Sequence, residues 1–339
     1  MNVAAALLIS VAVAAPVYAS DAPAAAPPQT YAEQLAASVK RAVDAAIVAR
    51  PPKLVPPNKI TVAYKLAKLG TLDLGAPLVA LAAADLDGNG RSELYAVTAH
   101  DVIAIAVLSD KKPREIGRVA FLGERATIGP RDVVATATQD GGTLIASAST
   151  FAISSRLTWK KGAFVGEAGD PGFWMCAGER TQLVPGRNYF GDAQNNTYGV
   201  RCTNAFVDAD GYPMRARAQL SLANKLDVSV ERCAAKDLGC QPAAHHEYSN
   251  VGTAFEIADV DRDGTPEVLY AAGGALGEPD VLRVGTLGED EKKQKLKKTF
   301  AAGGIVGIAV ADFDGDGAPE AIVAVRLVGS PKVELWRLE

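Results

Sequence analysis

Short apolar or alternating runs follow one another along the chain from residue 59 onward. Examples are Ile60–Leu69, Leu78–Ala84, Leu94–Ala99 and Val102–Leu108. Runs of this length, separated by glycine, asparagine or aspartate, are typical of β-strands. The pattern therefore predicts an all-β domain over residues 59–339.

Residues 1–19 show a different pattern, which predicts an export signal. An apolar stretch from Val3 to Ala15 is followed by Val17-Tyr18-Ala19, a small-x-small cleavage site. The stretch is shorter than the about 20 residues needed to span a bilayer, and the sequence offers no second candidate span. We therefore expect an exported protein (periplasmic, cell-surface or secreted) with no membrane span in the mature chain.

Residues 20–30 read as a proline- and alanine-rich linker, and residues 31–50 predict one short amphipathic helix. Thr30 and Glu33 form a capping box at its start, and Pro51 and Pro52 end it. Its apolar stripe has four-residue spacing and consists of Leu35, Val39, Val43 and Ile47. We expect this stripe to pack against the domain that follows, with docking to a partner as the alternative.

A strand–loop–strand pattern occurs three times, at residues 81–94, 256–269 and 309–324. In each copy, side-chain oxygens stand at loop positions 1, 3, 5 and 9. These residues are Asp85, Asp87, Asn89 and Glu93; Asp259, Asp261, Asp263 and Glu267; and Asp312, Asp314, Asp316 and Glu320. Three matching copies indicate a repeat architecture.

The repeated loops predict up to three calcium (Ca²⁺) sites. Carboxylates crowded into nine residues repel one another unless a cation lies among them, and oxygen ligands in a flexible loop suit calcium better than magnesium. Glycine at position 6 allows the sharp bend, and position 7 (Arg91, Thr265 and Ala318) would contribute its backbone carbonyl. An EF-hand is excluded, because its closing glutamate falls at position 12 between helices. Polar hairpin turns without metal are the alternative.

The two later loops match the pattern Asp-x-Asp-x-Asp-Gly-x-x-Asp/Glu closely, and the first matches it less well. The repeats resemble the FG-GAP/VCBS repeat family, the calcium-looped propeller blades also found in integrin α-subunits. The glycine-rich flanks Gly75-Ala76-Pro77 and Gly273-Gly274-Ala275 add to the resemblance, which covers three segments of about 25 residues each. It implies a β-propeller with a calcium loop between the first and second strands of a blade. It does not imply a ligand, because the family includes adhesion proteins, lectins and accessory domains of enzymes.

The spacing of the loops predicts the number of blades. Asp259 and Asp312 are 53 residues apart, enough for four strands, and two degenerate loops fit between the first and second acidic loops. We assign these to residues 139–142, before the strand Thr143–Ala148, and to residues 191–196, before Tyr198–Cys202. The last repeat lacks an outer strand, which Ile60–Leu69 could supply and so close the ring. We expect five four-stranded blades, with six as the alternative.

All four cysteines lie between residues 176 and 240, and an even count in an exported chain favours disulfides. We expect Cys233–Cys240 as a local staple and Cys176–Cys202 across a degenerate blade. Zinc is the competing interpretation, but the spacing lacks a Cys-x₂₋₄-Cys pair.

Composition and charge narrow the function classes. A net charge of −4 is not typical of nucleic-acid binding, and the cationic run 292–298 is typical of a solvated edge strand. His245 and His246 are expected in a loop, and Asn250 stands where a metalloprotease would need its second histidine. Among the aromatic residues, Trp174 and Tyr212 are the best candidates for ligand contact, whereas the others are expected to pack between blades.

Two functional hypotheses follow from these observations. The first is a non-catalytic binding or scaffolding module for an extracytoplasmic protein or glycan. The alternative is an enzyme or enzyme subunit that acts on an extracellular polymer, with its site in the irregular segment 170–250.

Overall fold

A computed structural model describes most of the chain from residue 58 to the C-terminus. The described ranges are 58–108, 111–123, 135–151, 153–171, 173–176, 179–181, 197–202, 206–208, 211–221, 223–233, 240–272, 279–290, 293–301, 303–327 and 329–339, with the side chains of 108, 111 and 170–205 excepted. All of them belong to one compact unit, Leu54–Glu339. The expected export signal (1–19), linker (20–30) and helix (31–50) lie outside the described residues.

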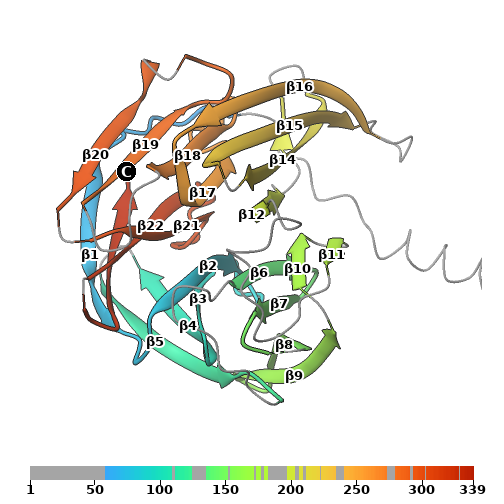
Figure 1. Ribbon diagram of the computed structural model, residues 1–339, viewed down its shortest axis with the longest axis vertical. Coiled ribbons are helices and arrows are strands. Elements are labelled where there is room, and N and C mark those ends of the chain that lie inside the picture. Colours follow the sequence, from blue (N-terminus) through green and yellow to red (C-terminus); the bar gives the residue numbers. More distant parts are fainter. Residues whose placement is uncertain are drawn as a thin grey trace, which may run out of the picture. The chain divides into compact units, whose positions relative to one another are not determined.

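The strands form five four-stranded antiparallel sheets arranged as the blades of a propeller (Figure 1). Blade 1 contains β2 (Leu78–Ala84), β3 (Glu93–Thr98), β4 (Asp101–Leu108) and β5 (Lys111–Ala120). Blade 2 contains β6 (Ala135–Asp140), β7 (Thr143–Ala148), β8 (Ile153–Lys160) and β9 (Ala163–Pro171). Blade 3 contains β12 (Thr197–Cys202), β14 (Pro213–Ser221), β15 (Lys225–Cys233) and β16 (Cys240–Ser249), with β13 (Phe206–Val207) paired to β14. Blade 4 contains β17 (Val251–Ala258), β18 (Glu267–Ala272), β19 (Asp280–Thr286) and β20 (Leu296–Phe300).

Blade 5 closes the ring by combining the two ends of the domain. It contains β21 (Ile305–Ala311), β22 (Glu320–Arg326) and β23 (Lys332–Leu338), and its outer strand is β1 (Leu66–Asp73). The antiparallel pairing of β1 with β23 runs from Leu66 opposite Leu338 to Asp73 opposite Lys332. The predicted five blades and the closure by the N-terminal strand are therefore confirmed.

The closing strand begins later than the Ile60–Leu69 that the sequence predicted. The residues before it are used elsewhere: the Ile60 amide donates to the Asp261 carbonyl at 2.8 Å, and the Lys65 amide donates to the Glu339 carbonyl at 3.1 Å. Tyr64, between them, has a left-handed backbone with φ of 51°. This segment therefore contacts blade 4 before the chain enters blade 5.

The first strands of neighbouring blades contact one another near the centre of the ring. The contacting pairs are β2 with β21, β21 with β17, and β17 with β12, and β2 also contacts β6. A two-stranded hairpin, β10 (Phe173–Cys176) with β11 (Glu179–Thr181), contacts both β6 and β12 through β10 (Figure 1). Blades 2 and 3 are thus bridged by an inserted hairpin.

The core consists of apolar layers between adjacent blades. Four buried clusters join blades 1 and 5, blades 1 and 2, blades 3 and 4, and blades 4 and 5. Because a second strand has a neighbouring blade on each side, every residue of β3 is buried, and so are five successive residues of β22. This explains the continuous apolar runs in these strands. Each fully buried leucine or isoleucine contributes about 1.5–3 kcal/mol.

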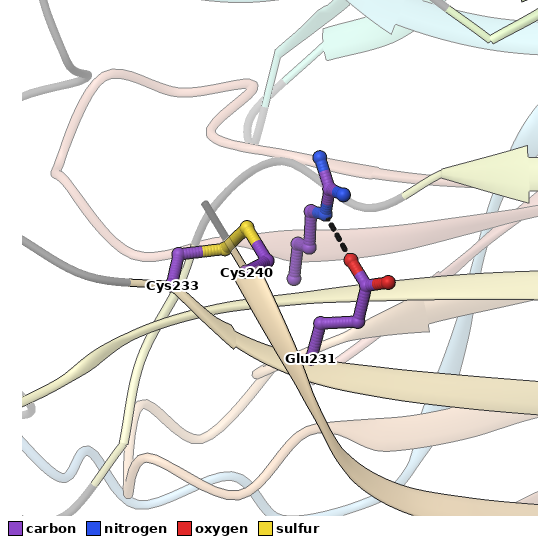
Figure 2. The surroundings of a disulfide bond; sticks show 4 residues. Glu231, Cys233 and Cys240 are labelled. Atoms are coloured by element: carbon purple, nitrogen blue, oxygen red, sulfur yellow. Dashed lines mark hydrogen bonds and ion pairs between the residues drawn. A yellow bond between two sulfur atoms is a disulfide. The ribbon is translucent and has the colours of Figure 1, made fainter. Parts of the chain in front are cut away.

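One disulfide joins the end of β15 to the start of β16 (Figure 2). Cys233 and Cys240 face each other in the strand register with a Cα–Cα distance of 4.0 Å. On the same sheet, Arg215 pairs with Glu231. The predicted local staple is confirmed, and it removes two of the four thiols that a zinc site would need. The side chains of the other expected pair, Cys176 and Cys202, lie outside the described residues. The disulfide is consistent with an extracytoplasmic location.

Residues 191–196, which we assigned to the second degenerate loop, lie outside the described residues, but the strand that follows them is not the second strand of a blade. That segment precedes β12, the first strand of blade 3, whereas the first-to-second-strand connection runs from β12 to β14. The sequence contains a signal for the correct position: Asp210-Gly211-Tyr212-Pro213 matches Asp263-Gly264-Thr265-Pro266 of an acidic loop. Position 9 is a methionine there, Met214, which hides the repeat.

Across the described residues, no helix has the length and apolarity needed to cross a membrane.

Candidate metal centres

Three acidic clusters lie in the connections between the first and second strands of blades 1, 4 and 5. We call these connections the blade-1 loop (85–93), the blade-4 loop (259–267) and the blade-5 loop (312–320). In each cluster, carboxylate oxygens from several residues lie within 4.8 Å of one another. The members are Asp85, Asp87 and Glu93; Asp259, Asp261 and Glu267; and Asp312, Asp314, Asp316 and Glu320. The structure thus brings together the predicted carboxylates, apart from Asp263, which lies outside its cluster.

The aspartate at position 1 organises each loop by accepting backbone hydrogen bonds. Asp85 accepts from the amides of Gly88 (2.8 Å) and Gly90 (2.9 Å), and Asp312 accepts from the corresponding Gly315 and Gly317. Asp259 accepts from Asp263 and Gly264. The glycine at position 6 has φ of 84° to 87° in all three loops, a conformation that costs little only for glycine. The shared bend therefore follows from the shared glycine.

In each loop, the glutamate at position 9 accepts a hydrogen bond from the backbone amide at position 2. The donors are Leu86 to Glu93 (3.2 Å), Val260 to Glu267 (2.8 Å) and Phe313 to Glu320 (2.9 Å). The side chain at position 2 is apolar and buried in every copy. A buried apolar neighbour therefore brings each closing carboxylate into a poorly solvated position.

Burial disfavours the ionised form of these closing glutamates. Burial raises the pKa of Glu93, and the charges of Asp87 and Asp85 raise it further. Burial also raises the pKa of Glu267, although the Lys295 ammonium acts in the opposite direction. For Glu320, burial and the charges of Asp314, Asp312 and Asp316 raise the pKa to about 7. Because a nearby cation favours the ionised form, each cluster gains stability from a positive charge among its oxygens.

Tyr95 is a second contact of the blade-1 cluster that the sequence did not reveal. It is fully buried, and its hydroxyl donates to Glu93 Oε2 at 2.9 Å. Because Tyr95 follows Glu93 by two residues on β3, both side chains lie on one face of the strand. An apolar-looking strand position thus supplies a polar contact.

Two lysines and a tyrosine contact the blade-4 cluster from distant parts of the chain. Lys295 Nζ lies 2.6 Å from Glu267 Oε1 and 3.1 Å from Asp261 Oδ2, and it donates to the Tyr64 hydroxyl at 2.9 Å. Lys59 Nζ lies 3.0 Å from Asp263 Oδ2. These partners are remote in sequence, so the loop motif alone did not indicate them.

The three acidic loops are also connected to one another across blade boundaries. Arg262 of the blade-4 loop donates to the Gly317 carbonyl of the blade-5 loop at 2.8 Å. The Ser92 amide of the blade-1 loop donates to the Asp312 carbonyl at 2.7 Å. Arg91 covers Gly315 so closely that an added Cβ there would lie 2.8 Å from Arg91 Cγ. The loops therefore form a continuous row across blades 4, 5 and 1.

The two adjacent histidines lie on strand β16 and not in a loop as predicted. His245 Nε2 is 3.6 Å from Asp227 Oδ1, whereas His246 approaches Gly288, where an added Cβ would lie 2.7 Å from its Cε1. Successive residues of a strand point to opposite faces, so these imidazoles diverge. Burial lowers the pKa of His246. The pair does not form a shared metal or catalytic site.

Tyr212 is a prominent exposed aromatic residue on the described surface. Half of it is exposed (50%), and the Arg232 guanidinium lies 4.3 Å from its ring centre. Arg232 is itself 2.8 Å from Asp208. By contrast, Trp159 is partly buried and packs against the apolar cluster that joins blades 1 and 2, which agrees with packing between blades. Its ring also contacts that of Phe164 on the neighbouring strand, with ring centroids 4.7 Å apart. The side chain of Trp174 lies outside the described residues.

Comparisons with known proteins give a fold-level likeness only. No protein-family model matches the sequence, and no curated protein matches it. Among solved structures, AofleA from Arthrobotrys oligospora is 10% identical with a TM-score of 0.43, over 82% of this chain and 90% of that one; a triple arginine-to-alanine mutant of it has a TM-score of 0.42 at the same identity and coverage. The Hadza microbial sialidase Hz136 is 7% identical with a TM-score of 0.35, over 80% and 66%. The propeller assignment rests on the strand pairing described above.

Proposed function

We propose that this protein is an exported, calcium-binding propeller that serves as a non-catalytic binding or scaffolding module for an extracytoplasmic protein or glycan. The observation that carries the proposal is the shared construction of the acidic loops. In blades 1 and 5, oxygen donors lie within 4.8 Å of one another and include a glutamate, buried in blade 1 and partly buried in blade 5, whose pKa is raised.

The donor set suits calcium better than other common metals. Carboxylate oxygens without thiolate or imidazole are hard ligands, which disfavours zinc and copper. Calcium accepts six to eight oxygens in irregular geometry, whereas magnesium demands a near-ideal octahedron. The backbone carbonyl at position 7 (Arg91, Thr265 or Ala318) and the amide oxygen of Asn89 are the further donors that we assign.

Calcium in these loops would act on the ring as a whole. Because hydrogen bonds link the loops of blades 4, 5 and 1, an ion that fixes one loop also fixes its neighbour. With free calcium tenfold above the dissociation constant, each occupied site adds about 1.4 kcal/mol to stability. This role is structural, and it explains acidic clusters without assigning catalysis to them.

The ligand surface that we propose is the edge of the ring that carries the acidic loops. Tyr212 lies in the first-to-second-strand connection of blade 3, the same type of connection as the acidic loops. A half-exposed tyrosine stacked on Arg232 offers a flat apolar ring and a cation, which together suit a sugar ring or a planar side chain. The divergent histidines on β16 give the alternative, an enzyme site in residues 170–250, no comparable support.

The test combines a glycan array with capture of partners from an envelope extract, each in calcium and in chelator. We expect binding in calcium, loss in chelator, and at least tenfold weaker binding for Tyr212→Ala. Ile116→Ala, an exposed apolar residue on β5 of blade 1, is the matched control and should bind normally. Binding that is equal in calcium and chelator would contradict the role of the ion, and the absence of any ligand or partner would contradict the binding function.

A further inference from the structure

We infer that the blade-4 loop carries its own cation, the Lys295 ammonium, and that the protein therefore binds two calcium ions, in the loops of blades 1 and 5, and not three. The inference rests on the proposed calcium binding and refines it. Its basis is a difference among three loops that the sequence motif treats as equivalent.

The Lys295 ammonium lies among the carboxylates of the blade-4 loop. Its nitrogen is 2.6 Å from Glu267 Oε1 and 3.1 Å from Asp261 Oδ2, and it donates to the Tyr64 hydroxyl at 2.9 Å. Glu267 is fully buried and the Asp261 side chain is 7% exposed. An ammonium group has three hydrogens to donate, and three acceptors are in place. The lysine therefore satisfies its own donors and offsets one of the two negative charges of the buried carboxylates.

Lys59 makes the same loop less suitable for an ion. Its ammonium binds Asp263 Oδ2 at 3.0 Å, and Asp263, at position 5, does not belong to the acidic cluster. In the blade-5 loop the position-5 residue, Asp316, does belong to its cluster. Calcium would lose one of its expected ligands in the blade-4 loop.

The charges of the two four-carboxylate loops differ accordingly. The blade-4 loop has four carboxylates and two lysine ammonium groups, which supply the two positive charges that one Ca²⁺ would bring. Within the described ranges, no ion pair with lysine or arginine reaches the four carboxylates of the blade-5 loop. A calcium ion entering the blade-4 loop would also face repulsion from an ammonium group only a few ångströms away. The blade-5 loop needs an external cation, and the blade-4 loop does not.

The contacts of Lys295 and Lys59 with the blade-4 loop, which we call the lysine clip, also join the segment before β1 to blade 4. Tyr64 and Lys59 come from the segment before β1, and the Ile60 amide donates to the Asp261 carbonyl at 2.8 Å. Lys295 comes from the connection before β20. The contacts thus bring three separate segments together without an ion, so the approach to the closing strand should hold in chelator.

The experiment is a count of bound calcium on the full chain by equilibrium dialysis and isothermal titration calorimetry. We expect two ions for the wild type, three for Lys295→Met, and two for the control Lys298→Met, which removes an exposed lysine of β20. In a second pair, Glu267→Gln should still bind two ions and Glu320→Gln only one. This pair keeps the test valid if Lys295→Met fails to fold.

The outcomes separate the two proposals. No bound ion on the wild type would overturn the proposed calcium function itself. Three ions on the wild type, or a loss of one ion in Glu267→Gln, would overturn the lysine clip while leaving calcium binding intact.

Discussion

The closing glutamate of each acidic loop is the residue on which burial and charge act together. Each accepts an amide from position 2, and burial raises the pKa of each. A raised pKa means that the folded, ion-free chain holds the proton more tightly than the unfolded chain. A bound cation reverses this preference, so proton and calcium should compete at Glu93 and Glu320.

Glu320 gives a prediction about pH. Its pKa is about 7 in the fold and 4.5 in the unstructured reference, so its contribution to stability is fully present below 4.5 and is lost as pH rises toward 7. In chelator, we expect the melting temperature of the wild type to fall between pH 5 and pH 8, and that of Glu320→Gln to fall less. Thermal denaturation measures this, with Glu289→Gln, an exposed turn residue, as the control. Equal pH profiles for wild type and Glu320→Gln would contradict it.

At the residue scale, the sequence predicts those contacts that are local in the chain. The convergence of Asp312, Asp314 and Glu320 could be predicted because nine residues of one loop contain all of them. Lys295 could not be assigned to the blade-4 loop in the same way. Its contact with Asp261 spans 34 residues, and that of Lys59 with Asp263 spans 204. The pairing of the strands of blade 4 brings the first two residues together, and the contact of the segment before β1 with blade 4 brings the second two together.

At the scale of elements, the loop conformation is set by backbone hydrogen bonds and two left-handed positions. The amide at position 7 donates to the side chain at position 5 in all three loops, with distances of 2.7 to 2.9 Å. Position 4 is left-handed as well, with φ of 72° at Gly88, 54° at Arg262 and 80° at Gly315. Arginine at such a position is strained, and the blade-4 loop tolerates it with its side chain bound to Gly317.

Substitution of Gly317 by alanine should measure the cost of this backbone conformation. Gly317 has φ of 86°, and no atom lies within 4 Å of an added Cβ, so the cost is backbone strain alone. We expect a loss of about 1–2 kcal/mol in the free energy of unfolding, together with weaker calcium binding. Gly142→Ala, which also has open space but lacks a left-handed φ, is the matched control and should change stability little. Urea denaturation in calcium distinguishes the two, and equal losses would contradict the argument.

The Cys233–Cys240 disulfide should stabilise blade 3 modestly. Its sequence separation of 7 closes a short loop, for which chain-entropy arguments give about 2–3 kcal/mol. The double variant Cys233→Ser/Cys240→Ser should lose about this much stability in urea denaturation. Calcium binding in the remote blade-1 and blade-5 loops should stay unchanged in the same variant. A loss below about 0.5 kcal/mol would show that the strand register alone holds this hairpin.

The boundaries of a strand follow the apolar pattern of the sequence where the whole apolar run pairs within one blade. Residues Leu78–Ala84 and Thr143–Ala148 form strands with the predicted limits. The predicted closing strand begins too early because residues 60–64 are also largely apolar, although Ile60 and Tyr64 contact Asp261 of blade 4. The blade-3 loop was misplaced because Met214 replaces the expected glutamate, which leaves only the turn residues Asp210 to Pro213 as a signal.

On the scale of the whole molecule, the restraints are unevenly distributed around the ring. The acidic loops occupy three consecutive blades, 4, 5 and 1, which include the blade that contains both ends of the domain. The described disulfide belongs to blade 3. The blades that meet at the closure are therefore those with ionic loops, where opening of the ring would begin.

Hydrogen exchange should show this distribution. In chelator, we expect faster exchange of the Leu86 and Phe313 amides, which donate to Glu93 and Glu320. The Ile60 and Val260 amides, which lie in the region held by the lysine clip, should remain protected from exchange. Exchange measured by mass spectrometry or NMR in calcium and in chelator would report both. Equal acceleration at all four amides would contradict the separate roles of the loops.

The most direct measurement of the central claim is an anomalous-scattering map from crystals grown in millimolar calcium. We expect a calcium peak in the blade-5 loop, among the oxygens of Asp312, Asp314, Asp316 and Glu320, and another in the blade-1 loop beside Asp85, Asp87 and Glu93. In the blade-4 loop, the Lys295 ammonium should lie at Glu267. An absence of peaks in the loops of blades 1 and 5 would contradict the account.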